Sequence, residues 1–213
     1  MKRAPNFNHV ARIYAPMEKL TFGPWLWRCR CSFMGDLKTQ RSGLVLGDGD
    51  GRFTAKLLSE NPLVLVDAVD ASVEMLNELS RNAGLHTGRV RVHLADARAW
   101  EPKGSAYDLI ATHFFLDCMT TTEVAELARK IRTRATPGAV WVVSEFAVPQ
   151  GWFGWLVAGP LVRALYLAFF MLTGLHVQRL PRYREAMAEA GWTQIKEDRL
   201  LGGLLVGELW SRQ

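Results

Sequence analysis

The residues with the clearest chemical potential are three glycines and two acids in one short loop. Residues 45–52 read V-L-G-D-G-D-G-R. Glycines at alternate positions let the chain turn sharply and let its backbone approach a ligand closely. The spacing G-x-G-x-G differs from the G-x-G-x-x-G of dinucleotide sites, and Arg52 stands where the third glycine of such a site would fall. Asp48 and Asp50 put negative charge into the loop, which disfavours pyrophosphate and favours a cationic ligand.

A further acid follows the glycines at the distance typical of a ribose-binding residue. Residues 67–72 read D-A-V-D-A-S. Asp70 lies about 20 residues beyond the glycines, where a carboxylate can accept two hydrogen bonds from a ribose diol. Asp67, three residues earlier, is the weaker candidate. The spacing therefore predicts that Asp70 binds a ribose.

Candidate proton acceptors lie farther along the chain. His113 and Asp117 occur in H-F-F-L-D, and His176 closes a long apolar segment. Each could remove a proton from an acceptor molecule. The structural alternatives are a hydrogen-bonded packing histidine for His113, a helix cap or salt bridge for Asp117 and a loop position for His176. Arg182 and Arg184 either bind an anionic acceptor or face water.

Three cysteines, Cys29, Cys31 and Cys118, are too few for a disulfide framework, and their spacing matches no zinc site. We therefore expect no metal and a reducing cytoplasm. Cys118 has no activating partner in the sequence, so we expect it to be buried.

These residues need a scaffold, and the pattern from residue 43 onward supplies one. Apolar runs alternate with helix-like segments, which predicts a doubly wound α/β fold: a mostly parallel, seven-stranded Rossmann-like sheet with a C-terminal antiparallel hairpin and an apolar helical insertion. Ligands of such folds bind outside the carboxyl ends of the strands. The expected strands are 43–46, 63–69, 90–94, 107–112, 139–144, 192–198 and 204–210. The expected helices are 52–59, 72–83, 122–133 and 181–190, and residues 136–138 are expected to form a turn.

Four motifs, in order, resemble those of class I S-adenosylmethionine (SAM)-dependent methyltransferases. They are V-L-G-D-G-D-G-R-F, V-D-A-S-V-E-M-L, L-A-D-A-R and Y-D-L-I-A-T-H-F-F-L-D, within residues 43–150. The resemblance implies that the loop wraps the methionine end of SAM, through Gly47, Asp48, Gly49, Asp50 and Gly51. It further implies that Asp70 holds the ribose, that Ala71 and Met75 flank the adenine, that Asp96 and Ala97 approach its amino group, and that Thr112 and His113 face the sulfonium. The family usually has an acid two residues before the first glycine, where this chain has Val45.

The first 41 residues are basic, with eight lysines and arginines against two acids, whereas the other 172 are close to neutral. A charge confined to one arm, without a recognition motif, argues against nucleic acid. It leaves a solvated arm or a surface facing phosphate or anionic lipid. The segment F-N-H-V-A-R-I-Y is loosely similar to the opening of the ubiquinone/menaquinone C-methyltransferases, which implies that Tyr14 packs near the cofactor; Ala15 replaces their aspartate. The alternative is a helix face that closes the sheet edge. We expect no signal peptide, because the first 25 residues lack its features.

Residues 151–175 are intensely apolar, with Arg163 as their single charge. Their length suits a membrane span, but two strands follow them and must return to the sheet, so we expect no crossing. Gly159 and Pro160 are expected to break the segment before a helix over residues 161–172. Three alternatives remain: core or dimer-interface packing, a lid over a hydrophobic substrate, or a surface in a membrane interface. As a lid, its aromatic residues would wall the acceptor pocket, chiefly Trp152, Trp155, Tyr166, Phe169 and Phe170.

We therefore expect one domain over residues 1–213. It comprises a basic helical arm (1–41), a SAM-binding core (42–150), an apolar lid (151–180) and a closing helix and hairpin (181–213). The predicted function is methyl transfer from SAM to a small, apolar or aromatic acceptor. The alternatives are a catalytically silent binding or scaffold protein of the same fold and an NAD(P)-dependent reductase. The expected location is cytoplasmic. Peripheral contact with a membrane and a homodimer formed through the insertion are both open alternatives.

Overall fold

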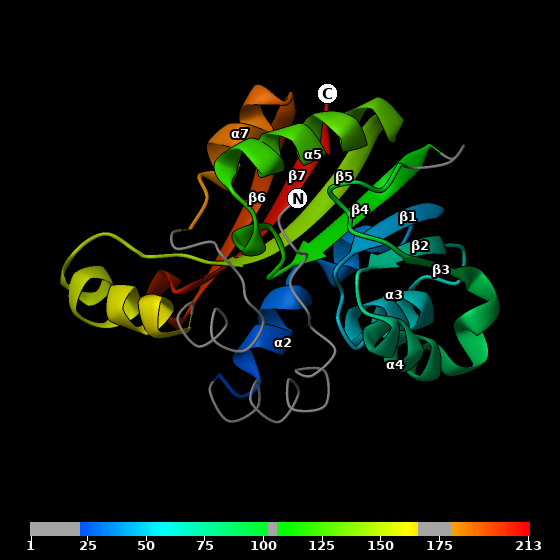
Figure 1. Cartoon of the computed structure of the whole chain (residues 1–213), viewed down its shortest axis with the longest axis horizontal. Helices are drawn as coiled ribbons and strands as arrows, with labels where there is room; N and C mark the ends of the chain where they lie inside the picture. The colour runs from blue at the N-terminus through cyan, green and yellow to red at the C-terminus, as the bar shows by residue number, and fades with distance from the viewer. Residues whose placement is uncertain (1–21, 102–105, 166–179) are drawn as a thin grey trace.

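Seven strands form one sheet in the order β3-β2-β1-β4-β5-β7-β6 (Figure 1). The computed structural model describes residues 22–101, 106–165 and 180–213. Strand β7 runs antiparallel to both β5 and β6, and the other pairs are parallel. The predicted doubly wound α/β fold with an antiparallel C-terminal hairpin is therefore confirmed. The strands are β1 (Ser42–Leu46), β2 (Leu65–Asp70), β3 (Val90–Leu94), β4 (Tyr107–His113), β5 (Ala135–Phe146), β6 (Trp192–Leu200) and β7 (Leu205–Arg212).

Helices cover both faces of the sheet (Figure 1). On one face, α5 and α7 pack on a cluster that includes Leu44, Leu46 and Trp141. On the other face, α3 and α4 pack on a cluster that includes Val45 and Ala111. Strand β1 is thus apolar on both sides, as expected of a central parallel strand. The longer helices are α3 (Arg52–Glu60), α4 (Val73–Ala83), α5 (Thr121–Arg134) and α7 (Tyr183–Glu189); the shorter ones are α2 (Trp25–Arg30), η1 (Met34–Leu37), η2 (Gly84–Arg89), η3 (Leu116–Cys118) and η5 (Leu201–Gly203).

Side-chain caps set the starts of two helices. Ser72 is the N-cap of α4, where its hydroxyl accepts a hydrogen bond from the Met75 N–H at 3.3 Å. Helix α5 was expected to start at Thr122 but begins at Thr121, because Thr120 and Glu123 form a reciprocal capping box.

Strand β5 begins earlier than the sequence predicted. Residues 136–138 carry the turn signals Pro137 and Gly138, yet they belong to the strand. Ala135 pairs with Tyr107, and the register shifts before Leu109 pairs with Val140, so the expected turn is a bulge. Gly138, at φ 76°, supplies the left-handed residue that this irregularity needs.

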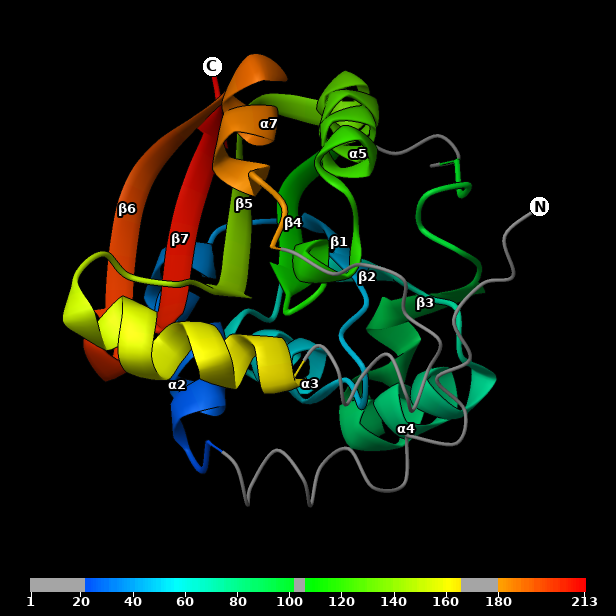
Figure 2. The ribbon, with the colours of Figure 1, turned by 60° about the vertical axis from the view of Figure 1, so that its left-hand side comes forward.

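The apolar insertion is helical over residues 152–165 and crosses the carboxyl end of β5 (Figure 2). The break predicted at Gly159 and Pro160 is wrong, because the helix continues through both residues. A π-helical turn, η4 (Gly154–Ala158), precedes them, and the Gly159 N–H donates to the Gly154 carbonyl. The wider turn makes room for a proline that would clash with a carbonyl in an ordinary helix. Residues 166–172 of the expected second helix lie outside the described residues.

The insertion rests on a third apolar cluster, at the end of the sheet. Ala158 and Val162 contribute to it together with Phe22 and Leu26 from the N-terminal region and Phe146 from β5. Within the described ranges, no helix combines the length and apolar character needed to cross a membrane.

Candidate active site

The loop between β1 and α3 depends on glycine at all three positions. Gly47, Gly49 and Gly51 have φ values of 64°, 64° and 77°, in the region that other residues rarely adopt. A Cβ at Gly47 would lie 2.2 Å from the Phe115 ring, and one at Gly51 would lie 2.5 Å from the Leu79 Cα. At Gly49 the nearest atom would be the Met75 sulfur at 3.9 Å. The first and third glycines thus allow close packing, and the second faces open space that a ligand could fill.

The two acids of this loop are occupied by the protein itself. Asp48 was expected to face the ligand, but it is buried and accepts hydrogen bonds from the Thr54 N–H at 2.9 Å and the Thr54 hydroxyl at 2.7 Å. Burial raises the pKa of Asp48 to about 6. Asp50 forms an ion pair with the Arg52 Nε at 2.7 Å. The loop acids therefore anchor the start of α3, and the negative charge expected toward a cationic ligand is largely satisfied within the protein.

Asp70 ends β2 beside the glycine loop. Its carboxylate accepts a hydrogen bond from the Ser72 N–H at 2.9 Å and lies against the backbone N–H groups of Gly49 and Ala71. Burial outweighs these bonds and raises the pKa of Asp70 to about 6. Its partners within the described part of the chain are backbone groups, and they leave acceptor positions on its oxygens for a diol.

Asp67 has a different environment from Asp70. Its buried carboxylate accepts a hydrogen bond from the Tyr107 hydroxyl at 2.9 Å, and it pairs with Arg91 and His93, each at 2.8 Å. These side chains come from β3 and β4, so Asp67 ties three strands together. The partners of Asp67 are thus side chains within the sheet, whereas those named for Asp70 are backbone groups of the loop.

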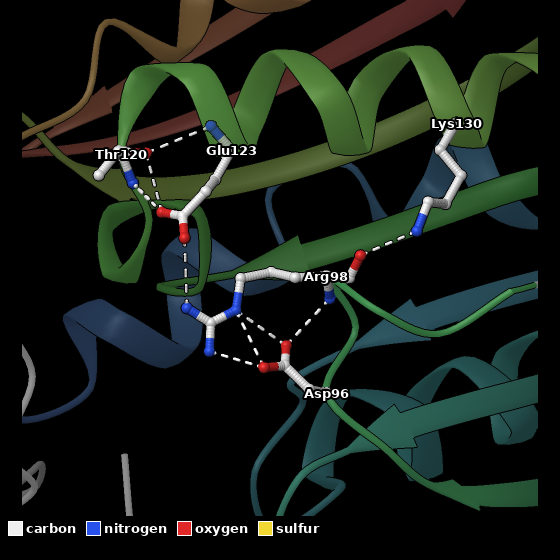
Figure 3. Close-up of polar contacts among 5 residues, drawn as sticks. All are labelled: Asp96, Arg98, Thr120, Glu123 and Lys130. Atoms are coloured by element: carbon white, nitrogen blue, oxygen red, sulfur yellow. Dashed lines mark hydrogen bonds and ion pairs between the residues drawn. The ribbon is translucent and has the colours of Figure 1, made fainter. Parts of the chain in front are cut away.

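The acid expected near the adenine is held in an ion-pair cluster (Figure 3). Arg98 forms a forked pair with Asp96, with its Nε 2.9 Å from Oδ1 and its Nη2 2.6 Å from Oδ2. Arg98 also approaches Glu123 at 3.4 Å, and the Lys130 ammonium donates to the Arg98 carbonyl at 2.8 Å. The cluster lowers the pKa of Asp96, chiefly through Arg98. The cluster fastens the loop after β3 to α5. Of the other residues expected near the adenine, Met75 and Ala97 are buried and Ala71 is exposed.

The two residues at the end of β4 point to opposite faces of the sheet. The Thr112 hydroxyl accepts a hydrogen bond from the Trp141 indole N–H at 2.9 Å, and its side chain is fully buried in the core. The side chain of Thr112 therefore does not face the site, contrary to expectation. His113 lies on the α3 side, with its ring centroid 4.2 Å from that of Phe53.

His113 is a buried, neutral base. Ser144 donates its proton to the Cys29 carbonyl at 3.2 Å, so the hydrogen bond of 2.9 Å between His113 Nδ1 and Ser144 Oγ is donated by the imidazole. This assignment leaves the lone pair on Nε2, which is buried and has no hydrogen-bond partner among the residues that the structure describes. Burial lowers the pKa of His113 well below its usual value, and the charge of Arg30 adds to the effect.

A buried carboxylate organises the turn after β4. Glu145 accepts hydrogen bonds from the backbone N–H groups of Phe115 at 3.2 Å, Leu116 at 2.8 Å and Asp117 at 3.3 Å. Phe114 opens the turn at φ 52°, a conformation that costs a non-glycine residue about 1–2 kcal/mol. Burial raises the pKa of Glu145 well above its usual value, and the nearby Asp117 carboxylate raises it further. Two carboxylates thus meet at the carboxyl ends of β4 and β5.

Several expected acceptor-side residues are placed differently from the prediction. Trp152 and Trp155 are 72% and 78% exposed, so they do not wall a closed pocket in this structure. Arg184 pairs with Glu197 at 2.7 Å and Glu208 at 2.5 Å, which makes it a structural link between α7 and the hairpin. Tyr14, Tyr166, Phe169, Phe170 and His176 lie outside the described residues.

Sequence reasoning missed three residues of this region. Ser144 ends the expected strand 139–144 and Glu145 lies just beyond it, and neither is assigned a role from the sequence, although this fold binds ligands at the carboxyl ends of its strands. Arg30 was counted in the basic arm, but it is buried with its guanidinium 5.4 Å from the Phe114 ring centroid. Its charge acts on both Asp48 and His113. The region therefore combines a glycine loop, a carboxylate held by backbone groups (Asp70) and buried acid–base groups.

Comparisons with known proteins point to methyltransferases. Residues 44–138 match the methyltransferase-domain family. Trans-aconitate 2-methyltransferase of Rhodococcus jostii (strain RHA1) is 32% identical over 110 residues, which are 52% of this chain and 39% of that protein.

Two solved structures share the fold at low sequence identity. A putative O-methyltransferase from Nostoc punctiforme PCC 73102 has a TM-score of 0.75 and 18% identity, over 98% of this chain and 61% of that chain. The SAM-dependent methyltransferase SibL has a TM-score of 0.66 and 20% identity, over 100% of this chain and 63% of that chain. This chain thus spans less than two thirds of each of these relatives.

Proposed function

We propose that this chain, whose residues 44–138 form a class I SAM-dependent methyltransferase domain, moves a methyl group from SAM to a small, largely apolar acceptor. The observation that carries the proposal is the open space at Gly49 directly beside the Asp70 carboxylate. Both lie at the carboxyl edge of the parallel strands, where ligands of this fold bind. The cofactor follows from the domain; the acceptor and the reaction on it are our proposal.

The described residues fit SAM. The left-handed loop from Gly47 to Gly51 exposes backbone to the methionine end, and a side chain at Gly49 would fill that space. In this proposal Asp70 accepts hydrogen bonds from the ribose hydroxyls. When bound, SAM supplies an activated methyl group on its sulfonium. The residues of the chain contribute alignment, which can be worth roughly 7–11 kcal/mol of a transfer barrier.

The acceptor side is apolar and aromatic. Phe114 packs against Phe146 with ring centroids 5.0 Å apart, and Phe146 packs against Phe22 at 5.3 Å. These rings adjoin the turn that carries Asp117. An apolar or aromatic molecule would pack on such rings, and a nearby carboxylate would orient its nucleophile.

Two groups could take a proton from the acceptor. Asp117 lies on the turn that Glu145 holds, and His113 offers the unpartnered lone pair of Nε2. We favour Asp117, because it adjoins the aromatic rings, whereas His113 lies on the α3 side against Phe53. Replacing each in turn separates them: Asp117→Asn should lower kcat, and His113→Gln should mainly weaken SAM binding.

Calorimetry tests the cofactor assignment. We expect SAM and S-adenosylhomocysteine to bind and NADPH not to bind, which would also exclude the reductase alternative. Asp70→Asn should weaken SAM binding at least tenfold, whereas Asp36→Asn, at a surface ion pair with Lys196, should not. Equal affinity of wild type and Asp70→Asn would overturn the assignment.

A second candidate function is SAM binding without methyl transfer. This second function is favoured by the buried Val45, which stands where the family usually has an acid. Methyl transfer from labelled SAM to a panel of phenols, quinols, carboxylates and thiols distinguishes the two: transfer supports the enzyme, and binding without transfer supports the silent protein. We place either activity in the cytoplasm, because free thiols suit a reducing compartment and Cys29, Cys31 and Cys118 are all free.

A further inference from the structure

The helical segment 152–165 is apolar on two faces, and the described residues cover only one of them. On the inner face, Ala158 and Val162 are buried in the third cluster. On the outer face, Trp152 and Trp155 are largely exposed, and Leu156 is 57% exposed. Single exposed apolar residues are ordinary, but a contiguous group on one helix marks a surface that interacts with a partner or a membrane.

Within residues 152–165 the single charged side chain is Arg163, which is positive. Arg163 is exposed and borders a hollow of about 340 Å³ that Trp155 and Pro149 also line. The sequence contains no acidic residue between Glu145 and Glu185. Helix α2, which shares the third cluster, adds an exposed Trp25 with the Arg28 guanidinium 5.5 Å from its ring centroid.

We propose that the outer face, defined by Trp152, Trp155, Leu156 and Arg163, docks on the surface of an anionic lipid bilayer. Tryptophan favours the boundary between headgroups and acyl chains, because its ring is apolar and its N–H can stay hydrated. Arginine beside it can pair with lipid phosphates. A second copy of the chain would bring the same acid-free, cationic face against itself, whereas anionic headgroups supply the opposite charge. The docking surface does not depend on the proposed methyl transfer.

Vesicle flotation with the full chain tests the proposal. We expect binding to vesicles of phosphatidylcholine with one quarter phosphatidylglycerol, weaker binding to phosphatidylcholine alone, and a loss of binding at high salt. The double variant Trp152→Ala/Trp155→Ala should bind at least tenfold more weakly. Arg163→Gln should lose on the order of fivefold on anionic vesicles only.

A matched pair of leucines provides the control. Leu85 is fully exposed on η2, far along the chain from the insertion. Leu156→Ser should weaken vesicle binding, and Leu85→Ser should not. All these side chains are exposed, so the melting temperatures should stay close to that of the wild type; if the double tryptophan variant does not fold, Leu156→Ser and Arg163→Gln decide the matter.

Three results would overturn the proposal. One is the absence of wild-type binding to anionic vesicles. Another is an equal loss for Leu85→Ser and Leu156→Ser. The third is a stable dimer, seen by light scattering without lipid, that dissociates in the double tryptophan variant, because a second copy would then be the partner of this face.

Discussion

Gly51 and Gly138 have nearly the same backbone conformation in very different surroundings. Their φ values are 77° and 76°, but a Cβ at Gly51 would lie 2.5 Å from the Leu79 Cα, whereas one at Gly138 would meet nothing within 4 Å. A left-handed conformation costs a non-glycine residue about 1–2 kcal/mol, and forcing an atom into a packed contact adds about 1–3 kcal/mol. We therefore expect Gly138→Ala to lower the free energy of unfolding by about 1–2 kcal/mol and Gly51→Ala by about 2–5 kcal/mol.

Gly49→Ala completes this comparison, because Gly49 has a similar φ but faces open space. Its stability loss should match that of Gly138→Ala, while its affinity for SAM should fall more than tenfold. Urea unfolding measures the first quantity and calorimetry the second. The reasoning on packing is refuted if Gly51→Ala costs no more than Gly138→Ala. The placement of the cofactor is refuted if Gly49→Ala binds SAM like the wild type.

Three further predictions concern the acids of the site. Ribose hydroxyls donate to the ionised form of Asp70, whose pKa is about 6, so the affinity for SAM should weaken as the pH falls through 6. Calorimetry from pH 5 to 8 should show this weakening for the wild type and a constant affinity for Asp70→Asn. Burial raises the pKa of Asp48 in the folded state from 3.8 to about 6, so the stability that protonated Asp48 contributes is lost as the pH rises through this range. Asp48→Asn does not titrate, so its free energy of unfolding in urea should gain on the order of 1–3 kcal/mol relative to wild type between pH 4 and 7. A difference that stays constant with pH would contradict this. Glu145→Gln should lower the free energy of unfolding by about 1–3 kcal/mol and lower kcat, with SAM affinity unchanged. Asp117→Asn should lower kcat without a change in melting temperature. An unchanged kcat in either variant would show that the residue does not act on the acceptor side.

The arrangement of strands and helices could be predicted from the sequence, because the apolar pattern of each element agrees with its position in the fold. The errors occurred where a local signal competed with pairing or packing. Pro137 and Gly138 indicate a turn, but the pairing of Ala135 with Tyr107 draws them into β5. Pro160 indicates a helix break, but the preceding π turn accommodates it.

The site was harder to predict from the sequence than the fold, because the direction of a side chain depends on contacts with residues distant in sequence. The positions of the glycines were evident, but the inward turn of Asp48 depends on Thr54. The two-residue period of a strand places Thr112 and His113 on opposite faces, so they could not both face one ligand. The role of Glu145 depends on backbone N–H groups 28 to 30 residues earlier, which no local pattern reveals.

The π turn in the insertion also sets the rotational phase of everything after it. Each residue of an α-helix advances about 100° around the axis, and a π turn accommodates an additional residue per turn. A regular helix of the same residues would advance every later residue by one place, so Leu161 would occupy the buried place of Val162, and Val162 would occupy the exposed place of Arg163. The irregular turn thus acts as a phase adjustment that keeps Val162 against the third cluster.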